Sequence, residues 1–205
     1  MLVVGAGGIA DAWLPPILAE KLQVCGVVDM RLDAARARIE KYNLNAPVFA
    51  DVADALAVTR PDFVLDLTVP DAHCAVTCAA LRRGLPVMGE KPMAASLAQA
   101  RRMLRAAEAA KTLYMVSQSR RWVGHHATIA RAVRRGLLGP LTTLNCDFYI
   151  GAHFGGMHAA LREMLAYLRT GRQPKTECHD NIKSLAMVFA AIKSARAGRR
   201  VAITV

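Results

Sequence analysis

The sequence lacks the features of a membrane protein and of a disulfide-stabilised secreted protein. None of its apolar runs approaches the length needed to cross a bilayer, and the apolar start "MLVVGAGGIA" has no basic leader or cleavage site before its glycines. Cysteine is scarce: the 205 residues include five, an odd number in apolar or helical settings, which fits reduced thiols better than a disulfide framework. We therefore expect a cytoplasmic protein without a membrane partner.

Aromatic side chains are also few, at 5% of the residues, which weakens the case for a nucleic-acid partner. The formal net charge is +11 and the isoelectric point is about 10.0. However, the arginines are spread over many predicted helices and do not form one basic tract. We expect solvated helix faces and no nucleic acid, and attraction for a phosphate-bearing small molecule is a second consequence of the charge.

Clusters of metal-ligating side chains are equally scarce. Cys74 and Cys78 are one helical turn apart beside His73, but a metal site would need further ligands nearby and the sequence offers none. We predict no metal ion.

Apolar residues, by contrast, make up 54% of the sequence and follow a regular alternation. Through residues 1–117, short β-branched runs alternate with amphipathic stretches, a pattern typical of βαβ units around a parallel sheet. We predict an α/β fold with a Rossmann-type doubly wound parallel sheet over residues 1–118, followed by an incomplete α+β domain over residues 119–205. The expected strands are 2–4, 24–28, 63–67, 85–88 and 113–116, and the expected helices are 32–42, 52–59, 72–83 and 97–111.

Local signals mark several helix ends. Ser96 and Gln99 form a capping box at the start of the helix 97–111, and Gly84 follows the helix 72–83 as a C-terminal cap would. Pro15 and Pro16 lie where the first crossover helix should run. We expect that helix to start late, with proline in its first turn.

A glycine-rich loop, "GAGGIA", directly follows the first strand. Gly5, Gly7 and Ala10 occupy the positions of the dinucleotide-binding fingerprint, whose last place accepts alanine. Gly5 permits the tight turn, Gly7 lets a pyrophosphate approach the backbone, and Ala10 lets the helix pack closely on the strand. Gly8 and Ile9 complete the predicted contact with the cofactor, where amide dipoles at the helix start favour the anion. Glycines can also merely close a turn, but the position between strand and crossover favours cofactor binding.

The second predicted strand ends in Asp29, at about the spacing expected of an acid that binds the ribose hydroxyls of the cofactor. A carboxylate there favours NAD, because it would repel a 2′-phosphate. Arg31 nearby leaves NADP open as an alternative.

A lysine, Lys91, follows the strand 85–88 in the segment "LPVMGEKPMA". It emerges at a carboxyl end of the sheet, the edge at which open α/β sheets bind ligands, and Pro92 biases it towards an extended conformation. A cation there could hydrogen-bond a substrate hydroxyl and relay its proton as hydride leaves the same carbon. The alternative is a solvated lysine in a turn.

Four segments together resemble the Gfo/Idh/MocA oxidoreductases: the glycine loop, "DLTVPDAH" (66–73), "GEKPMA" (89–94) and "SQSRRW" (117–122). The resemblance covers the nucleotide-binding half. It implies an NAD(P)-dependent dehydrogenase that transfers hydride to or from a carbinol carbon of a sugar, cyclitol or related polyol. It also implies a small-molecule substrate and the capacity to form homo-oligomers.

The resemblance assigns roles to single residues. It implies a catalytic and cofactor-contacting role for Lys91, with Glu90 and Pro92 shaping the nicotinamide end of the site. Arg121 is expected to touch the substrate. Apart from the resemblance, His153 in the segment "GAHFGG" could line a substrate pocket. The further residues that the resemblance places beside the cofactor are Thr68, Pro70, His73 and Arg120.

Beyond Trp122 the resemblance weakens, because most of an expected second-domain sheet is absent. We predict a helix near 127–135, a lone strand over 141–150, an amphipathic helix closed by Gly171, and a final helix and end strand. A lone strand leaves backbone groups unpaired, and both flanks of the gap remain similar to the family, so we predict a missing segment near Gly156 and Met157. A purified chain of 22.1 kDa would contradict that hypothesis.

The same gap removes the helix whose Asp and His complete the active site in the family. His153 and His158 lie beside the gap but do not occupy that motif, so neither is assigned as a catalytic base. The first hypothesis is therefore a dehydrogenase whose second domain is incomplete. A catalytically silent NAD(P)-binding protein, acting as a sensor or assembly subunit, is the second, and nucleic-acid binding through the positive charge is the third.

Overall fold

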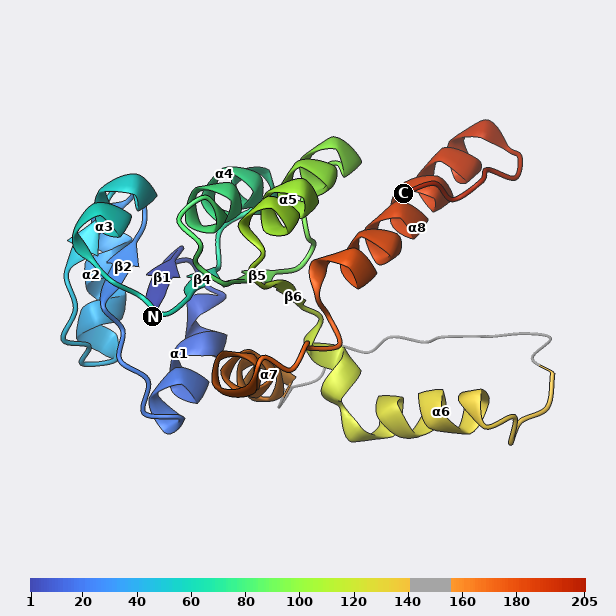
Figure 1. Ribbon diagram of the computed structural model, residues 1–205, viewed down its shortest axis with the longest axis horizontal. Coiled ribbons are helices and arrows are strands. Elements are labelled where there is room, and N and C mark those ends of the chain that lie inside the picture. Colours follow the sequence, from blue (N-terminus) through green and yellow to red (C-terminus); the bar gives the residue numbers. More distant parts are fainter. Residues whose placement is uncertain (141–155) are drawn as a thin grey trace.

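A six-stranded parallel sheet forms the centre of the molecule (Figure 1). The computed structural model describes residues 1–140 and 156–205. The strand order is β3-β2-β1-β4-β5-β6, with every pair of neighbours parallel, so two βαβαβ halves meet between β1 and β4 as in a Rossmann fold. The strands are β1 (Leu2–Val4), β2 (Gly26–Val28), β3 (Val48–Phe49), β4 (Val64–Asp66), β5 (Val87–Glu90) and β6 (Tyr114–Ser117). The predicted Rossmann fold is confirmed.

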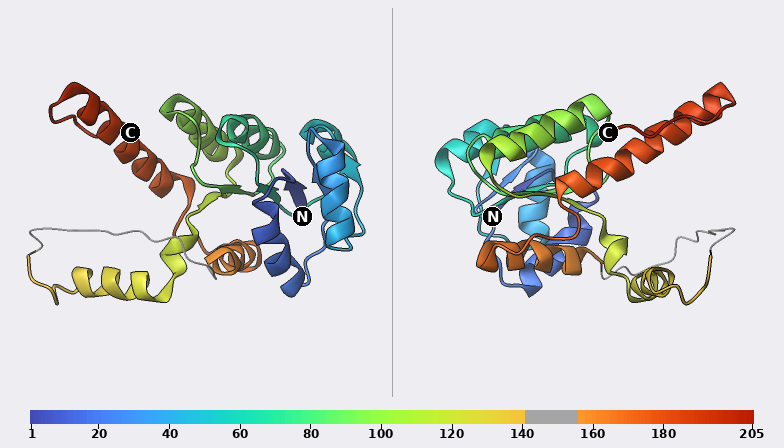
Figure 2. Two further views of the ribbon diagram at one scale, coloured as in Figure 1. Left: turned by 180° about the vertical axis from the view of Figure 1, so that it is seen from behind. Right: turned by 45° about the vertical axis from the view of Figure 1, so that its right-hand side comes forward.

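Helices cover both faces of the sheet, and each face has its own apolar core (Figure 2). The helices are α1 (Ala10–Ala19), α2 (Leu32–Lys41), α3 (Val52–Val58), α4 (Pro70–Leu81), α5 (Leu97–Ala110), the 3-10 helix η1 (Ser119–Trp122), α6 (Gly124–Arg134), α7 (Gly156–Thr170) and α8 (Cys178–Ala197). One core lies under α3, α4, α5 and α8, and the other under α1, α2 and α7. All strands except β3 are buried, which explains why their sequences are nearly continuous apolar runs.

The first helix corrects a sequence expectation. α1 begins at Ala10, directly after the glycine loop, and Pro15 and Pro16 lie in its middle and not in its first turn. Two prolines remove two intrahelical hydrogen bonds, a cost that packing must offset. Trp13 and Ile17 on this helix are fully buried against the sheet, which supplies the compensating apolar burial.

Two further differences concern strands. β3 was not predicted, because its two residues are only partly buried at the edge of the sheet and its sequence carries little periodic signal. The predicted end strand is wrong: residues 201–205 form no strand.

The predicted helix ends are confirmed in their main features. The Ser96 hydroxyl accepts the N–H of Gln99 at 3.2 Å, and the Gln99 side chain accepts the N–H of Ala95 at 3.1 Å, one residue before the expected partner. Gly84 adopts a φ of +72°, the left-handed conformation that glycine favours after a helix.

The C-terminal helices of the predicted second domain pack on the Rossmann sheet. α7 lies against α1 and η1, with Ala160, Leu161 and Met164 fully buried, and α8 lies against α5 and β6 through Ile182 and its neighbours. The strand predicted over 141–150 lies outside the described residues. The domain boundary at residue 118 therefore stays a prediction, and α7 and α8 share their cores with residues 1–117.

Within the described ranges, no helix combines the length and the apolar character that a bilayer crossing requires.

Candidate cofactor site

The carboxyl ends of β1, β2 and β4 border a cavity of about 460 Å³. It lies where the strand order reverses between β1 and β4, the position at which open α/β sheets bind ligands. The predicted residues that line it are Gly5, Gly7, Asp29, Arg31 and Thr68. The remaining lining residues come from β1, β2 and the residues after it, the start of α3 and the residues before it, the β4–α4 connection, and α4; they are Val4, Val28, Met30, Ala50, Asp51, Val52, Leu67, Val69, Ala72, Ala75 and Val76.

The glycine loop has the geometry that the fingerprint predicts. Gly5 has a φ of +101°, and a Cβ there would lie 2.7 Å from the carbonyl carbon of Leu67, so a side chain is excluded by the backbone that directly follows β4. A Cβ on Gly7 or Gly8 would meet no protein atom within 4 Å. The protein's own packing therefore does not require glycine at these two positions, whereas close approach of a ligand would.

The start of α1 offers hydrogen-bond donors to an anion. In the described part of the chain, the N–H groups of Gly7, Gly8 and Ile9 donate to no protein acceptor. Such free donors at the positive end of a helix suit a phosphate group. Ala10 is 1% exposed, consistent with the close helix–strand contact predicted for it. The loop therefore fits the pyrophosphate of a dinucleotide.

Asp29 stands at the end of β2, at the edge of the cavity. Its carboxylate accepts the N–H of Ala6 at 2.8 Å and the N–H of Arg31 at 2.9 Å. These bonds fix the carboxylate against the glycine loop, and a carboxylate has lone pairs left for ribose hydroxyls. The arrangement is that of an acid that would repel a 2′-phosphate, with Arg31 on the same cavity wall.

The loop after β4 contributes the third wall. Thr68 lines the cavity and Pro70 is the first residue of α4, where its missing N–H costs nothing. His73 is 1% exposed and does not line the cavity; its Nδ1 lies 3.1 Å from the Asp66 carboxylate. Of the three residues expected beside the cofactor here, the structure brings Thr68 to the cavity and puts His73 beneath it.

Lys91 follows β5 at the same edge of the sheet. Asp66 of β4 is paired with Gly89 of β5. Thr68 follows Asp66 by two residues and Lys91 follows Gly89 by two residues, so the two side chains come from equivalent positions after neighbouring strands. Lys91 is exposed, unlike Glu90 before it, which is 5% exposed. The Glu90 carboxylate accepts the indole N–H of Trp13 at 2.8 Å and the backbone N–H of Lys91 at 2.9 Å. Glu90 therefore links the lysine loop to the helix that follows the glycine loop.

The two arginines of η1 have different surroundings. Arg121 donates to the Asp180 carboxylate at 2.7 Å and to the Lys175 carbonyl at 3.3 Å, so it connects η1 to the start of α8. The carbonyl of Arg120 lies 3.2 Å from Nδ1 of His126. Neither arginine lines the cavity, and His153 lies outside the described residues. Their roles stay predictions.

Sequence reasoning missed two buried polar groups at this edge. Trp13 is fully buried and its N–H is held by Glu90. Asp66 is 0% exposed within an otherwise apolar strand, and a charged residue inside such a run was the available signal. Its charge reaches Tyr114 on β6: burial raises the pKa of the Tyr114 hydroxyl well above its ordinary value, and the Asp66 charge raises it further.

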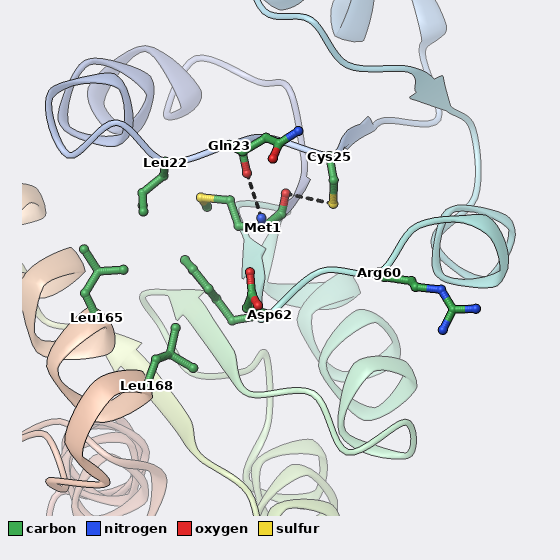
Figure 3. Close-up of a pocket in the computed structure, with 9 residues that line it drawn as sticks. Met1, Leu22, Gln23, Cys25, Arg60, Asp62, Leu165 and Leu168 are labelled. Carbon is green, nitrogen blue, oxygen red and sulfur yellow. Dashed lines mark hydrogen bonds between the residues drawn. The ribbon is translucent and has the colours of Figure 1, made fainter.

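A larger cavity, of about 590 Å³, lies at the opposite edge of the sheet (Figure 3). Met1, Cys25 and Asp62 line it together with Leu165 and Leu168 of α7. The amino group of Met1 donates to the Gln23 carbonyl, and the Cys25 thiol donates to the Met1 carbonyl. The glycine loop and the strand ends that carry Asp29, Thr68 and Lys91 are at the other edge, so we place the functional site there despite the smaller volume.

Among the described residues, Glu177, Cys178 and His179 bring their potential metal-ligating atoms within 4.8 Å of one another. Protein contacts already engage them: Glu177 caps α8 through the N–H of Asp180, and His179 bridges Glu177 and Glu108. Burial and the Glu177 charge raise the pKa of the Cys178 thiol to about 12, which disfavours the thiolate that a metal needs.

The fold and the cavity define a dinucleotide-binding protein of the Rossmann class. Residues 1–118 match the family model described as Gfo/Idh/MocA, oxidoreductase family, NAD-binding Rossmann fold. Because the match covers more than half of the chain, the protein belongs to this family.

Curated relatives carry names of sugar and cyclitol dehydrogenases. The chain is 31% identical to the D-glucoside 3-dehydrogenase of Escherichia coli over 141 residues, covering 68% of this chain and 40% of the relative. It is 29% identical to an inositol 2-dehydrogenase of Klebsiella pneumoniae over 147 residues, covering 70% of this chain and 44% of the relative. The chain thus spans well under half of the length of these relatives.

Solved structures agree on the fold. The WlbA dehydrogenase from Chromobacterium violaceum, in complex with NADH and UDP-GlcNAcA, has a TM-score of 0.63 at 28% identity, over 67% of this chain and 40% of that chain. The aldose-aldose oxidoreductase from Caulobacter crescentus has a TM-score of 0.80 at 17% identity, over 97% of each chain, and supports the fold alone.

Proposed function

We propose that this protein is an NAD-dependent oxidoreductase that transfers hydride between the nicotinamide and a carbinol carbon of a sugar, cyclitol or related polyol. The observation that carries the proposal is the position of Lys91, one strand away from the cavity wall formed by Thr68. The names of the relatives, which are glucoside and inositol dehydrogenases, support the substrate class.

The chain's own residues would divide the work as follows. The N–H groups of the glycine loop bind the pyrophosphate, and Asp29 accepts hydrogen bonds from a ribose and selects against a 2′-phosphate. NAD supplies the hydride acceptor when it is bound. Lys91 hydrogen-bonds the substrate hydroxyl and holds the proton that leaves that hydroxyl. Glu90, buried and bonded to the Lys91 N–H, keeps the lysine backbone at the strand end.

The test combines cofactor binding with turnover. Titration with NADH and NADPH, followed by protein fluorescence or calorimetry, should show binding with a preference for NADH. A panel of polyols and sugars with NAD should then produce NADH. Lys91→Met keeps the length of the side chain without its charge and should lower kcat about a hundredfold with little change in NADH affinity. A protein that binds no dinucleotide would refute the proposal at its first step.

The second candidate is a cofactor-binding protein without turnover. It is favoured by the reach of the family model, which matches the NAD-binding residues 1–118 and not the residues beyond them. NADH binding without reduction of NAD by any compound in the panel would support this candidate. The intact mass of the purified protein bears on the same choice, because a mass well above 22.1 kDa would reveal the suspected additional segment.

A further inference from the structure

A buried carboxylate, Asp66, lies at the end of β4, two residues before the cavity residue Thr68. Asp66 is 0% exposed. Its Oδ1 accepts the N–H of Thr68 at 3.1 Å and the hydroxyl of Thr68 at 2.6 Å, and its Oδ2 accepts the hydroxyl of Thr77 at 3.1 Å. The Thr68 N–H can only donate and both hydroxyls donate, so Asp66 acts as the acceptor in all three hydrogen bonds.

The helix α4 uses two faces at this point. Thr77 and His73, one turn apart, reach Asp66, whereas Ala72, Ala75 and Val76 line the cavity. Asp66 thus sits between the sheet, the helix and the loop that forms one wall of the nucleotide cavity. Asp66 itself does not line the cavity, and Thr68 is the one of its hydrogen-bond partners named here that does.

The hydrogen bonds fix the direction in which the Thr68 hydroxyl can act. Its single hydrogen is engaged by the Asp66 carboxylate, because a carboxylate can only accept. His73 Nδ1 lies 3.2 Å from the Thr68 oxygen and 3.1 Å from Oδ1 of Asp66, so a hydrogen on Nδ1 faces both of these acceptors. With its hydrogen held by Asp66, the Thr68 oxygen has only lone pairs left for a ligand, so towards a ligand the hydroxyl can accept a hydrogen bond but cannot donate one.

We propose that Asp66 is a positioning residue that sets the polarity of the nucleotide cavity through Thr68. By holding the Thr68 hydrogen, it presents an acceptor to the cofactor, and the complementary ligand group is a donor such as a ribose hydroxyl and not a phosphate oxygen. The inference rests on the proposed function, because it assumes that the cavity binds a dinucleotide.

Asp66→Asn tests the inference with almost no change in shape. The asparagine amide can donate to the Thr68 oxygen, which frees the hydroxyl hydrogen and removes the enforced polarity. We expect the dissociation constant of NADH to rise about tenfold. In a Thr68→Val background the same substitution should change the affinity by less than about twofold, because the effect travels through Thr68. Thr68→Ser, which keeps the hydroxyl, should retain the wild-type affinity.

Thr77→Val is the matched control. It removes a hydrogen bond to the other oxygen of Asp66 and does not touch Thr68. We expect it to lower the melting temperature and to leave the NADH affinity within about twofold of the wild type. Comparison of NADH affinity with melting temperature separates a positioning role of Asp66 from a structural one. If the role were only structural, Asp66→Asn and Thr77→Val would both lose stability, and neither would lose NADH affinity selectively.

NADH analogues that each lack one ribose hydroxyl complete the experiment. One of these analogues lacks the ribose hydroxyl that donates to Thr68. The wild type and Asp66→Asn should bind that analogue with equal affinity. Wild-type NADH binding together with an unchanged affinity of Asp66→Asn would overturn the inference and leave the proposed function standing. Failure of the wild type to bind NADH would overturn both.

Discussion

The Rossmann sheet with its covering helices differs sharply from α6 and the outer part of α8. Under the sheet-covering helices, Trp13, Leu65 and Leu161 are fully buried. On α6, Ile129 is 56% exposed and Val133 is 38% exposed, and on α8 Met187 is 57% exposed. Figure 1 shows both helices extending away from the sheet. α6 and α7 are amphipathic helices of similar pattern, but among the described residues only α7 has an extensive apolar partner.

The difference shows that an amphipathic pattern predicts a helix but does not predict whether its apolar face is buried. α7 and α6 both have one apolar face, yet α7 places that face on the core beside α1, whereas the described part of the chain offers α6 little beyond η1. Most of the stability of a short helix comes from tertiary packing. We therefore expect substitutions in the first region to be costly and equivalent substitutions on α6 to be nearly neutral.

The largest effect is expected in the glycine loop. Gly5→Ala should destabilise the protein by about 4 kcal/mol, because alanine is strained at positive φ and its Cβ would overlap the Leu67 backbone. Gly7→Ala is the matched control: it meets no protein atom, so it should keep the wild-type stability and lose NADH affinity. Chemical denaturation and NADH titration measure the two quantities. Equal stability of the two variants would contradict the geometry of the loop.

A core-to-surface pair tests the comparison directly. Leu161→Ala on α7 should lower the free energy of unfolding by about 3 kcal/mol, because it leaves a cavity between α7 and α1. Ile129→Ala on α6 should change it by less than about 0.5 kcal/mol, as expected of an exposed position. A cost at Ile129 close to that at Leu161 would show that α6 is covered in solution, by further chain or by another copy.

The sequence predicted the features that follow from a local pattern and missed those that depend on tertiary packing. The sheet was predictable because buried strands are continuous apolar runs and the glycine loop has a fixed relation to β1 and α1. β3 was missed because two partly buried residues carry no period. The start of α1 was placed too late, because propensity rules count the cost of Pro15 and Pro16 without the burial of Trp13.

The sequence predicted where the site residues lie in the fold, but it did not predict the hydrogen bonds between them. Spacing placed Asp29 and Lys91 at strand ends, and strand ends of a parallel sheet meet at one edge. Spacing could not reveal that Glu90 is held by Trp13, 77 positions away along the chain, or that Thr68 is held by Asp66 beneath it. Those contacts depend on the register of β4 with β5 and on the packing of α1, which no local pattern records.

A smaller effect is expected at the edge of the cavity. Asp29→Asn removes the charge that repels a 2′-phosphate and keeps the shape of the side chain. The ratio of NADPH to NADH affinity should rise about tenfold, aided by Arg31 on the same wall. Parallel titrations with the two cofactors measure the ratio, and Asp33→Asn, on the exposed start of α2, is the control that should leave it unchanged. An unchanged ratio in Asp29→Asn would mean that another group reads the ribose.

The smallest effect concerns the attachment of α8 to α5. A hydrogen bond to Glu177 and then one to Glu108 raise the pKa of His179 above its ordinary 6.5. A raised pKa in the folded state means that the stabilisation is fully present below the ordinary pKa and is lost as the pH rises through the raised one. The melting temperature of the wild type should exceed that of His179→Gln by about 2 °C near pH 6. The effect is small because His179 and Glu108 are both half exposed. The difference in melting temperature should shrink by about pH 8.5, where His179 loses its proton. If the difference in melting temperature grew with pH, the hydrogen bonds of His179 to Glu177 and Glu108 would not be stabilising its protonated form.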